Sequence, residues 1–379
     1  MIKKKFKDIS LDITEAEYRA DGAIHYSALA AFERGGFHAV AHINDKKETD
    51  ALTFGSIVDT MLTDSMEAFR EQYHVTVMPD NMSSQIKNVV DTLFLNYQDS
   101  CFSIDEIPEV AILSILNDIN YGKGWRNETR LAKVREPGRE YYRQMKLAQG
   151  KTVISDEMYQ DALNCVNALR TSPNTKPIFE RDSPFSNIEH CYQFKFRAYI
   201  KLKQQGPVND YNVVGTYGLS SSQEEELINA GYIPVTIMAD DIIVNHEKKV
   251  IFPFDLKTSS HFEDEFYKSV ADWNYYIQAR LYYRVIKANM IRDPYFKEFE
   301  LKDYNFVIVN KKSLVPLVWN YSDTQKFGTL YYGKNKQIIA HDPYDLAVQL
   351  WHYIHDDCVV ADGITLAKPN NLVEYLNNL

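Results

Sequence analysis

The chain has 379 residues, of which 45% are hydrophobic, 13% aromatic and 25% charged. This composition is typical of a globular protein and excludes a mainly disordered chain, a collagen-like repeat and a low-complexity scaffold. Forty-two Lys and Arg residues against 52 Asp and Glu residues give a formal net charge of −10, which excludes a uniformly basic surface that binds nucleic acid everywhere.

The first part of the chain, residues 1–184, is predicted to be mostly helical and to belong to the same fold as the rest. Hydrophobic residues recur there at helical spacing in several stretches, and Ser155 is expected to cap the strongest of them. The expected helices begin at Ser27 and Ser155 and cover 51–62, 86–97 and 107–119.

From residue 185 to residue 379 the pattern changes to short alternating or β-branched runs between helices. Strands are predicted at 191–200, 234–244, 250–255, 304–309 and 314–319, and helices at 266–287 and 343–354. The second and third strands are joined by a polar turn, which indicates a hairpin. We therefore expect an α/β (α+β) fold, with a mixed β-sheet core flanked by helices and a helical N-terminal layer.

The four cysteines do not have the spacing of a zinc site, and the chain is long for a disulfide scaffold. They are Cys101, Cys165, Cys191 and Cys358. The basic N-terminus leads into Asp8 without an apolar stretch, and no run approaches 18 apolar residues. We expect a soluble cytoplasmic protein with no membrane span, no iron–sulfur cluster and no nucleotide cofactor.

Three ionisable residues stand at the ends of the hairpin strands. Asp255 and Lys257 end one apolar strand, and the period of two places both side chains on one face. Asp240 ends the equally apolar run before it. Because the two strands are expected to pair, these three side chains are predicted to converge on one point.

Such a cluster suits metal-dependent hydrolysis. Two neighbouring carboxylates repel each other unless a divalent cation neutralises them, and hard oxygen ligands suit Mg²⁺ or Mn²⁺. Lys257 can orient and help to deprotonate the water that attacks a phosphodiester. The alternative is a buried ion pair, Asp255–Lys257 or Asp240–Lys257, with no catalytic role.

A further pair of polar residues follows on the next helix, where Gln278 and Tyr282 share a face. With them, the sequence resembles the PD-(D/E)xK nuclease superfamily, and within it the RecE-like (exodeoxyribonuclease VIII) and phage exonuclease branch. The segments that carry the resemblance are Asp240-Asp241-Ile242-Ile243, Asp255-Leu256-Lys257-Thr258 and Gln278-x-x-x-Tyr282. The resemblance is strong over residues 185–290 and weaker in two N-terminal segments, 25–29 and 54–59. Asp59 stands where the family has a metal-facing His.

The resemblance implies a role for each matched residue. Asp240 and Asp255 would be metal ligands, with the carbonyl of Leu256 completing the shell. Lys257 would activate the water, and Gln278 and Tyr282 would position Lys257 or the scissile phosphate.

The family also has an acidic residue upstream of these motifs. Glu189, at the start of the first predicted strand, is the chosen candidate for this catalytic and metal-binding position. Gln193 is the rival candidate, and Glu180 is a third.

The implied activity is that of a Mg²⁺-dependent deoxyribonuclease, a 5′-to-3′ exonuclease on linear double-stranded DNA in phage or prophage recombination. The family implies a homo-oligomer, and a single-strand annealing protein is the expected partner. Two alternatives remain: a catalytically silent DNA-binding or assembly protein on the same fold, and a structure-selective or single-strand endonuclease of the same superfamily.

The expected DNA-binding surface is a local basic stretch. Residues 121–151 hold nine Lys or Arg and three Glu, a net charge of +6, with aromatic residues between them. Phosphate neutralisation with base stacking would suit a strand-threading groove, but a solvated helical face with internal ion pairs explains the pattern equally well. The predicted DNA-binding residues are Lys123, Trp125, Arg126, Arg130, Lys133, Arg139 and Arg143.

Overall fold

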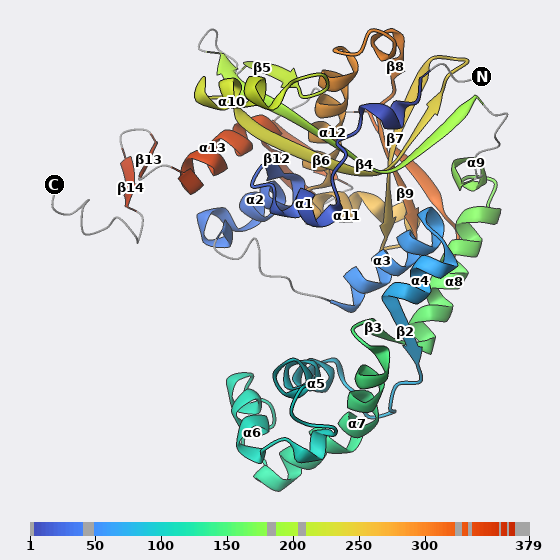
Figure 1. Cartoon of the computed structure of the whole chain (residues 1–379), viewed down its shortest axis with the longest axis vertical. Coiled ribbons are helices and arrows are strands. Elements are labelled where there is room, and N and C mark those ends of the chain that lie inside the picture. Colours follow the sequence, from blue (N-terminus) through green and yellow to red (C-terminus); the bar gives the residue numbers. More distant parts are fainter. Residues whose placement is uncertain are drawn as a thin grey trace. The chain divides into compact units, whose positions relative to one another are not determined.

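The computed structural model describes residues 4–40, 49–179, 187–203, 210–322, 328–332, 336–355, 358–361 and 364–367. In these residues the chain forms 13 α-helices and a mixed, mostly antiparallel eight-stranded sheet packed against helices (Figure 1). The predicted fold class is therefore confirmed. The chain divides into two compact units: unit 1 comprises residues 1–49 and 168–379, and unit 2 comprises residues 50–167. This division differs from the expected boundary at 184/185, because the N-terminal 49 residues belong with the sheet.

Unit 1 contains the eight-stranded sheet. Its main path runs β10-β9-β7-β6-β4-β5. The strands are β4 (Ile188–Lys203), β5 (Asp210–Gly215), β6 (Ile233–Asn245), β7 (Val250–Thr258), β9 (Tyr304–Val309) and β10 (Leu317–Tyr321). β6 and β7 form the predicted antiparallel hairpin, and the Asn245 side chain accepts a hydrogen bond from the Lys248 N–H in its turn (2.9 Å).

One edge of strand β6 pairs with β4, and the other edge pairs with two further strands. Its first half pairs in parallel with β1 (Ile24–His25), and its last residues pair with β7. The short strand β8 (Glu300–Leu301) pairs with the start of β7. The ladder between β6 and β7 ends at the pair Asp241–Phe254. Asp240 and Asp255 are therefore the first residues beyond the point where the two strands part.

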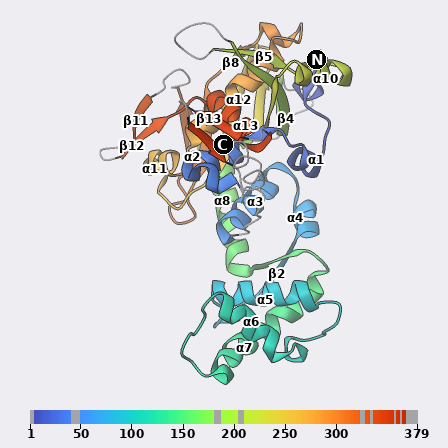
Figure 2. The same cartoon turned by 90° about the vertical axis from the view of Figure 1, so that its left-hand side faces the viewer.

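The helices of unit 1 cover this sheet. Helix α12 (Tyr275–Met290) packs on β4, β5, β6 and β9 and contacts α2 (Tyr26–Val40), α11 (Phe266–Trp273) and α13 (Pro343–His355). Figure 2 shows the hairpin of β11 (Gly328–Tyr332) and β12 (Lys336–Ala340) beside α11. The remaining elements of unit 1 are η1 (Phe6–Ile9), α1 (Glu15–Ala20), α9 (Lys176–Phe179), α10 (Ser221–Asn229), η3 (Glu263–Glu265), η4 (Phe296–Glu298), β13 (Cys358–Ala361) and β14 (Ile364–Ala367).

One predicted helix is wrong in its extent. The stretch 266–287 was expected to be continuous, but it is divided into α11 and α12 at Asn274. Asn274 has φ 56°, in the left-handed region that Asn adopts more readily than most residues. The Ile277 N–H consequently bonds the Asn274 carbonyl (2.9 Å), and the carbonyl of Trp273 is released from the helical pattern.

Unit 2 has its own hydrophobic core, built mainly from α5, α6 and α7. Its elements are α3 (Asp50–Thr63), α4 (Met66–Gln72), β2 (Tyr73–Thr76), α5 (Ser84–Tyr97), η2 (Ile104–Glu106), α6 (Glu109–Asp118), α7 (Asn127–Ala148), β3 (Thr152–Ser155) and the first part of α8 (Asp156–Thr171). The Ser155 hydroxyl caps α8 as predicted, by accepting a hydrogen bond from the Met158 N–H (3.0 Å). Of the helices described, none combines the length and the apolar character needed to cross a membrane.

Candidate functional site

The predicted acidic cluster forms where β6 and β7 part. Asp255 is 1% exposed, and its Oδ2 forms an ion pair with the Lys257 ammonium. The Asp240 carboxylate reaches across from β6, and its Oδ2 accepts a hydrogen bond from the Leu256 N–H (2.8 Å). The structure thus brings Asp240, Asp255 and Lys257 together, as the hairpin pattern predicts.

Helix α12 and strand β9 fix the Asp255 carboxylate from the other side. Gln278 Nε2 donates to Asp255 Oδ1 (2.6 Å), and the Tyr304 hydroxyl lies 3.4 Å from the same oxygen. Gln278, predicted to position Lys257 or the scissile phosphate, therefore contacts Asp255. Its other amide atom, Oε1, is buried and has no hydrogen-bond partner within the described chain.

Tyr282 supports this arrangement indirectly. Its ring packs edge-on against Tyr304 at a centroid distance of 5.5 Å. Burial, together with the nearby Asp255 carboxylate, raises the pKa of both hydroxyls well above its usual range. Both tyrosines are therefore neutral at physiological pH. Tyr282, predicted to position Lys257 or the scissile phosphate, packs on Tyr304, which in turn contacts Asp255.

The Lys257 ammonium is enclosed by aromatic rings as well as carboxylates. Its Nζ lies 4.8 Å from the centroid of the Tyr275 ring, and the Tyr26 ring stands 6.4 Å from that of Tyr275. Burial tends to lower the pKa of Lys257, but Asp255, Tyr275, Asp240 and Tyr26 together outweigh it, and the net pKa is raised. Lys257 is consequently a positively charged hydrogen-bond donor.

The donor set fits one hard divalent cation. The Asp240 carboxylate bonds the backbone of Leu256, the neighbour of Asp255, whose own carboxylate pairs with Lys257, and carboxylate oxygens suit Mg²⁺ or Mn²⁺. The free amide oxygen of Gln278 beside Asp255 offers an acceptor for a water molecule. Among the described residues no three His, Cys, Asp or Glu side chains gather as a metal-binding group.

Glu189 lies away from this cluster. It pairs with Val244 in the β4–β6 register, four residues along β6 from Asp240. Its carboxylate accepts hydrogen bonds from the Phe6 N–H (2.8 Å), the Lys7 N–H (3.0 Å) and His246 Nε2 (2.7 Å). Glu189 therefore holds the N-terminal segment on the sheet, and the structure does not bring it to the predicted metal position beside Asp240.

The rival position, Gln193, is the one that register places opposite Asp240. The pairs Tyr192–Asp241 and Phe194–Ala239 flank it on both sides. Gln193 itself has φ 50°, an uncommon conformation for a residue with a side chain. Glu180, the third candidate, lies outside the described residues.

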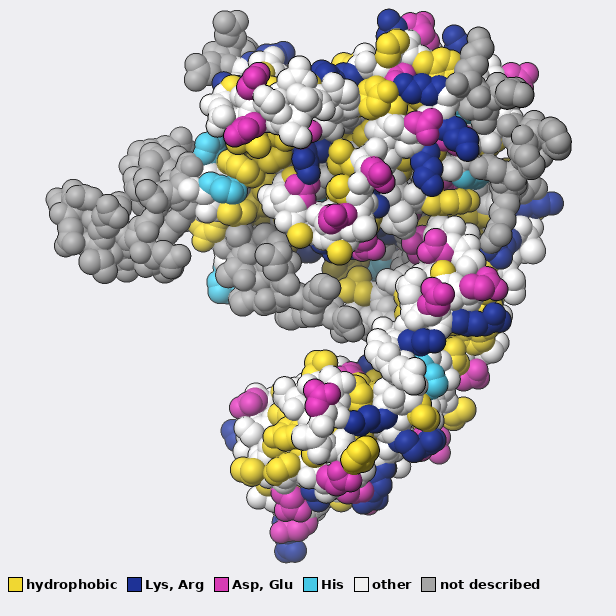
Figure 3. Space-filling model, in the orientation of Figure 1, with side chains coloured by type: hydrophobic (Ala, Val, Ile, Leu, Met, Phe, Trp, Pro, Cys, Tyr) yellow, Lys and Arg dark blue, Asp and Glu magenta, His cyan; other side chains and the backbone are white. Residues whose placement is uncertain are grey.

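The predicted DNA-binding residues all belong to unit 2, on or just before α7. Three of them are engaged within the unit: Arg130 is buried with Nε bonded to the Tyr121 carbonyl, Arg139 pairs with Asp105, and Arg143 pairs with Glu140. On the visible face of unit 2, Figure 3 shows acidic and basic side chains interspersed with hydrophobic ones. This basic stretch is thus partly neutralised by internal ion pairs.

The exposed remainder of that set is Lys123, Trp125, Arg126 and Lys133. None of its three cations pairs with a carboxylate in the described part of unit 2. Asp59, the residue at the family's His position, also belongs to unit 2, on α3.

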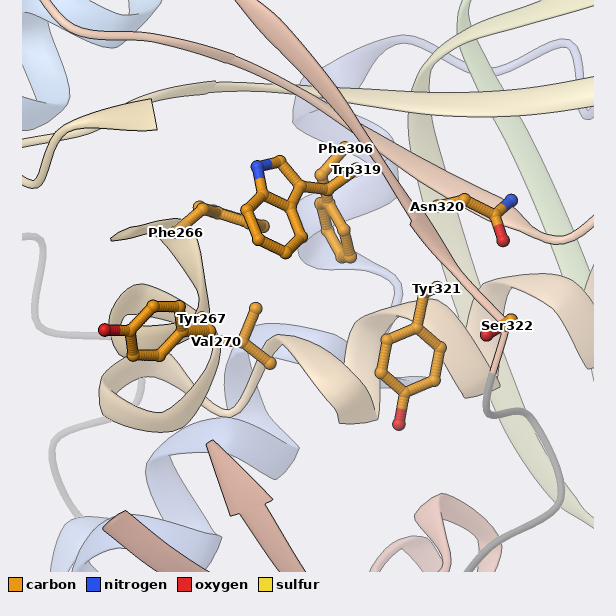
Figure 4. Close-up of a pocket in the computed structure, with 8 residues that line it drawn as sticks. All are labelled: Phe266, Tyr267, Val270, Phe306, Trp319, Asn320, Tyr321 and Ser322. Atoms are coloured by element: carbon orange, nitrogen blue, oxygen red, sulfur yellow. The ribbon is translucent and has the colours of Figure 1, made fainter. Parts of the chain in front are cut away.

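A cavity of about 200 Å³ lies between α11 and strands β9 and β10 (Figure 4). The rings of Phe266, Phe306 and Trp319 gather at one end, and the Trp319 indole N–H donates to the Glu263 carbonyl (2.8 Å). Its lining includes neither carboxylate of the cluster, nor Lys257. The lining is mainly aromatic, with Asn320 and Ser322 as further polar members, and it contains no carboxylate, histidine or lysine.

Sequence reasoning missed the aromatic neighbours of Lys257. Tyr275 stands one turn before Gln278 on α12, and this spacing would have placed it near the cluster. Tyr26 lies inside the N-terminal segment that carried the weaker part of the resemblance, but no motif there distinguishes it. Tyr304 follows from neither spacing nor motif, because only the parallel pairing of β7 with β9 brings it to Asp255.

No protein-family model, curated protein or solved structure matches this chain.

Proposed function

We propose that this protein is a Mg²⁺-dependent deoxyribonuclease that hydrolyses phosphodiester bonds at the Asp240–Asp255–Lys257 cluster. The observation that carries the proposal is the meeting of two carboxylates and a lysine at the point where β6 and β7 part. Paired carboxylates beside a half-buried lysine suit a metal-assisted attack of water on a phosphate. The resemblance of the three motifs to the PD-(D/E)xK nucleases points to the same chemistry.

Each residue of the cluster has a separate role in the proposed reaction. Asp240 and Asp255 would hold the cation, with the Leu256 carbonyl as the further ligand that the resemblance implies. The bound cation would supply positive charge to the phosphate and lower the pKa of its water. Lys257, whose ammonium pairs with Asp255, would orient the attacking water. Gln278 and Tyr304 hold Asp255 in the required rotamer.

The finer features of the proposal derive from the resemblance. They are an exonuclease action on linear double-stranded DNA, 5′-to-3′ polarity, a role in phage or prophage recombination, a homo-oligomeric assembly and a single-strand annealing protein as partner. A cytoplasmic location agrees with this role.

The test is degradation of labelled DNA in Mg²⁺ by the parent protein and by Asp240→Asn, Asp255→Asn and Lys257→Ala. We expect the parent to shorten linear duplex DNA from its ends and to leave covalently closed circles intact, and each variant to lose nearly all activity. Glu225→Gln changes an exposed carboxylate on α10 and serves as the control with parental activity. Labels at the 5′ and 3′ ends report polarity.

Two outcomes would contradict parts of this proposal. If all three variants degraded DNA at the parental rate, the cluster would not be the catalytic site. Cleavage of circular, nicked or flapped DNA would replace the exonuclease by the structure-selective endonuclease.

A second candidate function has one observation in its favour. Lys257 already neutralises Asp255 directly, as in an ion pair that serves the fold of a catalytically silent DNA-binding protein. In that case the parent would bind DNA and leave it intact in both Mg²⁺ and Mn²⁺.

A further inference from the structure

An arginine and a tryptophan stack on the surface near the tyrosines that surround Lys257. The Arg34 guanidinium, from α2, lies 5.5 Å from the centroid of the Trp273 ring at the end of α11. Arg34 Nη1 also donates to the Trp273 carbonyl (3.3 Å). This carbonyl is available because the helix breaks at Asn274, so the break between α11 and α12 provides the hydrogen-bond acceptor for Arg34.

Both side chains have polar groups that make no hydrogen bond or ion pair with the described residues. Arg34 is exposed, and in the described part of the chain no carboxylate pairs with it. Trp273 is 53% exposed, and its indole N–H makes no hydrogen bond to a described residue. Arg34 lies over the indole ring, and both side chains still expose much of their surface to solvent.

This pair is connected to the candidate site through two tyrosines. The Trp273 carbonyl that receives Arg34 also accepts a hydrogen bond from the Tyr26 hydroxyl (2.8 Å). The Tyr26 ring neighbours Tyr275, over which the Lys257 ammonium lies. The stacked pair is therefore separated from Lys257 by two side chains, a short span for a nucleic-acid strand that carries one phosphate per about 3.4 Å of helix axis.

We propose that Arg34 and Trp273 form a subsite for one unpaired nucleotide of the DNA strand that enters the candidate site. Arg34 binds a backbone phosphate, because its planar guanidinium suits phosphate oxygens. Trp273 stacks on the base, and this requires an unpaired base because both faces of a base are covered inside a duplex. The inference rests on the proposed function and adds to it a preference for a single-stranded or frayed end.

The experiment measures binding without cleavage. A labelled single-stranded oligonucleotide and the matching blunt duplex are titrated with the protein in EDTA, and anisotropy is followed at several salt concentrations. The proteins are the parent, Arg34→Ala, Trp273→Ala and Trp273→Phe. Lys297→Ala removes one exposed positive charge on η4 and serves as the matched control for net charge. Trp273→Ala leaves the backbone carbonyl that anchors Tyr26, so the surroundings of Lys257 are retained.

Each variant has its own expected signature. Trp273→Ala weakens single-strand binding by about 5-fold or more, the effect of losing one base–aromatic stack, and weakens duplex binding less. Trp273→Phe retains part of the stack and is intermediate. Arg34→Ala lowers the slope of log K against log salt by roughly 0.7 on single strands, because one phosphate contact is lost. Lys297→Ala matches the parent.

The outcomes separate this subsite from the proposed function. A parent that binds and degrades DNA while Arg34→Ala and Trp273→Ala bind both DNAs like the parent would overturn the subsite alone. A parent that neither binds nor cuts DNA would overturn both. If Trp273→Ala weakened binding to single strands and to duplex equally, Trp273 would not stack on an unpaired base. If Trp273→Ala changed the oligomeric state, this surface would instead be a contact between copies of the chain. Thermal melting of each variant establishes that it is folded.

Discussion

Asp255 is the residue on which the candidate site depends. Its two oxygens are engaged from opposite sides, Oδ1 by Gln278 and Tyr304 and Oδ2 by Lys257. The convergence of Asp255 with Asp240 could be predicted from the sequence, because a period of two and a short hairpin turn determine which ends meet. The partner of Gln278 could not, because helical spacing gives a face but not the rotation of α12 against the sheet.

The Lys257–Asp255 pair leads to a prediction that separates a metal site from a structural ion pair. Lys257→Ala leaves Asp255 buried without its counter-charge, which we expect to destabilise the metal-free protein by up to about 3 kcal/mol. A divalent cation binds only the folded site and no longer competes with the ammonium, so Mn²⁺ should raise the melting temperature of Lys257→Ala more than that of the parent.

Thermal melting in EDTA and in Mn²⁺ measures this difference. Asp240→Asn is the matched control in which Mn²⁺ should give no rise. Unchanged melting of both the parent and Lys257→Ala in Mn²⁺ would mean that the pair serves the fold only.

At the scale of the elements, strand β4 decides where the predicted residues lie. The sequence indicates a strand near residues 191–200, yet β4 spans Ile188–Lys203 and its register on β6 sets Glu189 against Val244. A strand's hydrophobic pattern fixes which face is buried but leaves its register open by steps of two residues. The break at Asn274 was equally hidden, because hydrophobic residues at spacings of four continue across it.

Glu189 gives the anchoring of the N-terminal segment a pH dependence. Burial tends to raise the pKa of Glu189, but hydrogen bonds from His246 and from the Lys7 and Phe6 N–H groups outweigh it and lower the net pKa below 4.5. A carboxyl with a lowered folded-state pKa stabilises the fold above its ordinary pKa, and this contribution is lost as the pH falls through the folded value.

We therefore expect Glu189→Gln to be less stable than the parent near neutral pH, and the difference to narrow as the pH falls below about 4.5. Urea unfolding at a series of pH values gives the free energy of unfolding for both proteins. The exposed variant Glu225→Gln should follow the parent throughout. A difference between Glu189→Gln and the parent that is constant across the acid range would refute the lowered pKa.

At the scale of the whole molecule, charge is distributed unevenly. The net charge of −10 includes the segment 121–151 with +6, so the remaining residues carry −16. The structure adds that this segment is not uniformly available, since Arg139 and Arg143 pair with Asp105 and Glu140. Composition predicted a local basic stretch correctly, but only the fold shows which of its cations are neutralised.

This distinction predicts different effects for two groups of variants in unit 2. Combined alanine substitution of Lys123, Arg126 and Lys133 should weaken DNA binding and reduce its salt dependence, because these exposed cations have no carboxylate partner in the described chain. Arg139→Ala with Arg143→Ala should have a smaller effect per charge removed. Anisotropy titrations at several salt concentrations measure both, and equal effects per charge would contradict the role of the ion pairs.

The central claim is that Asp240 and Asp255 hold a divalent cation next to Lys257, and a crystal structure of the protein soaked in Mn²⁺ tests it most directly. We predict an anomalous-scattering peak at about 2.1 Å from a carboxylate oxygen of each aspartate, the distance typical of a small divalent cation. The Lys257 ammonium should have moved off Asp255 Oδ2. An empty position between the two carboxylates, with Lys257 still paired to Asp255 at saturating Mn²⁺, would contradict the claim.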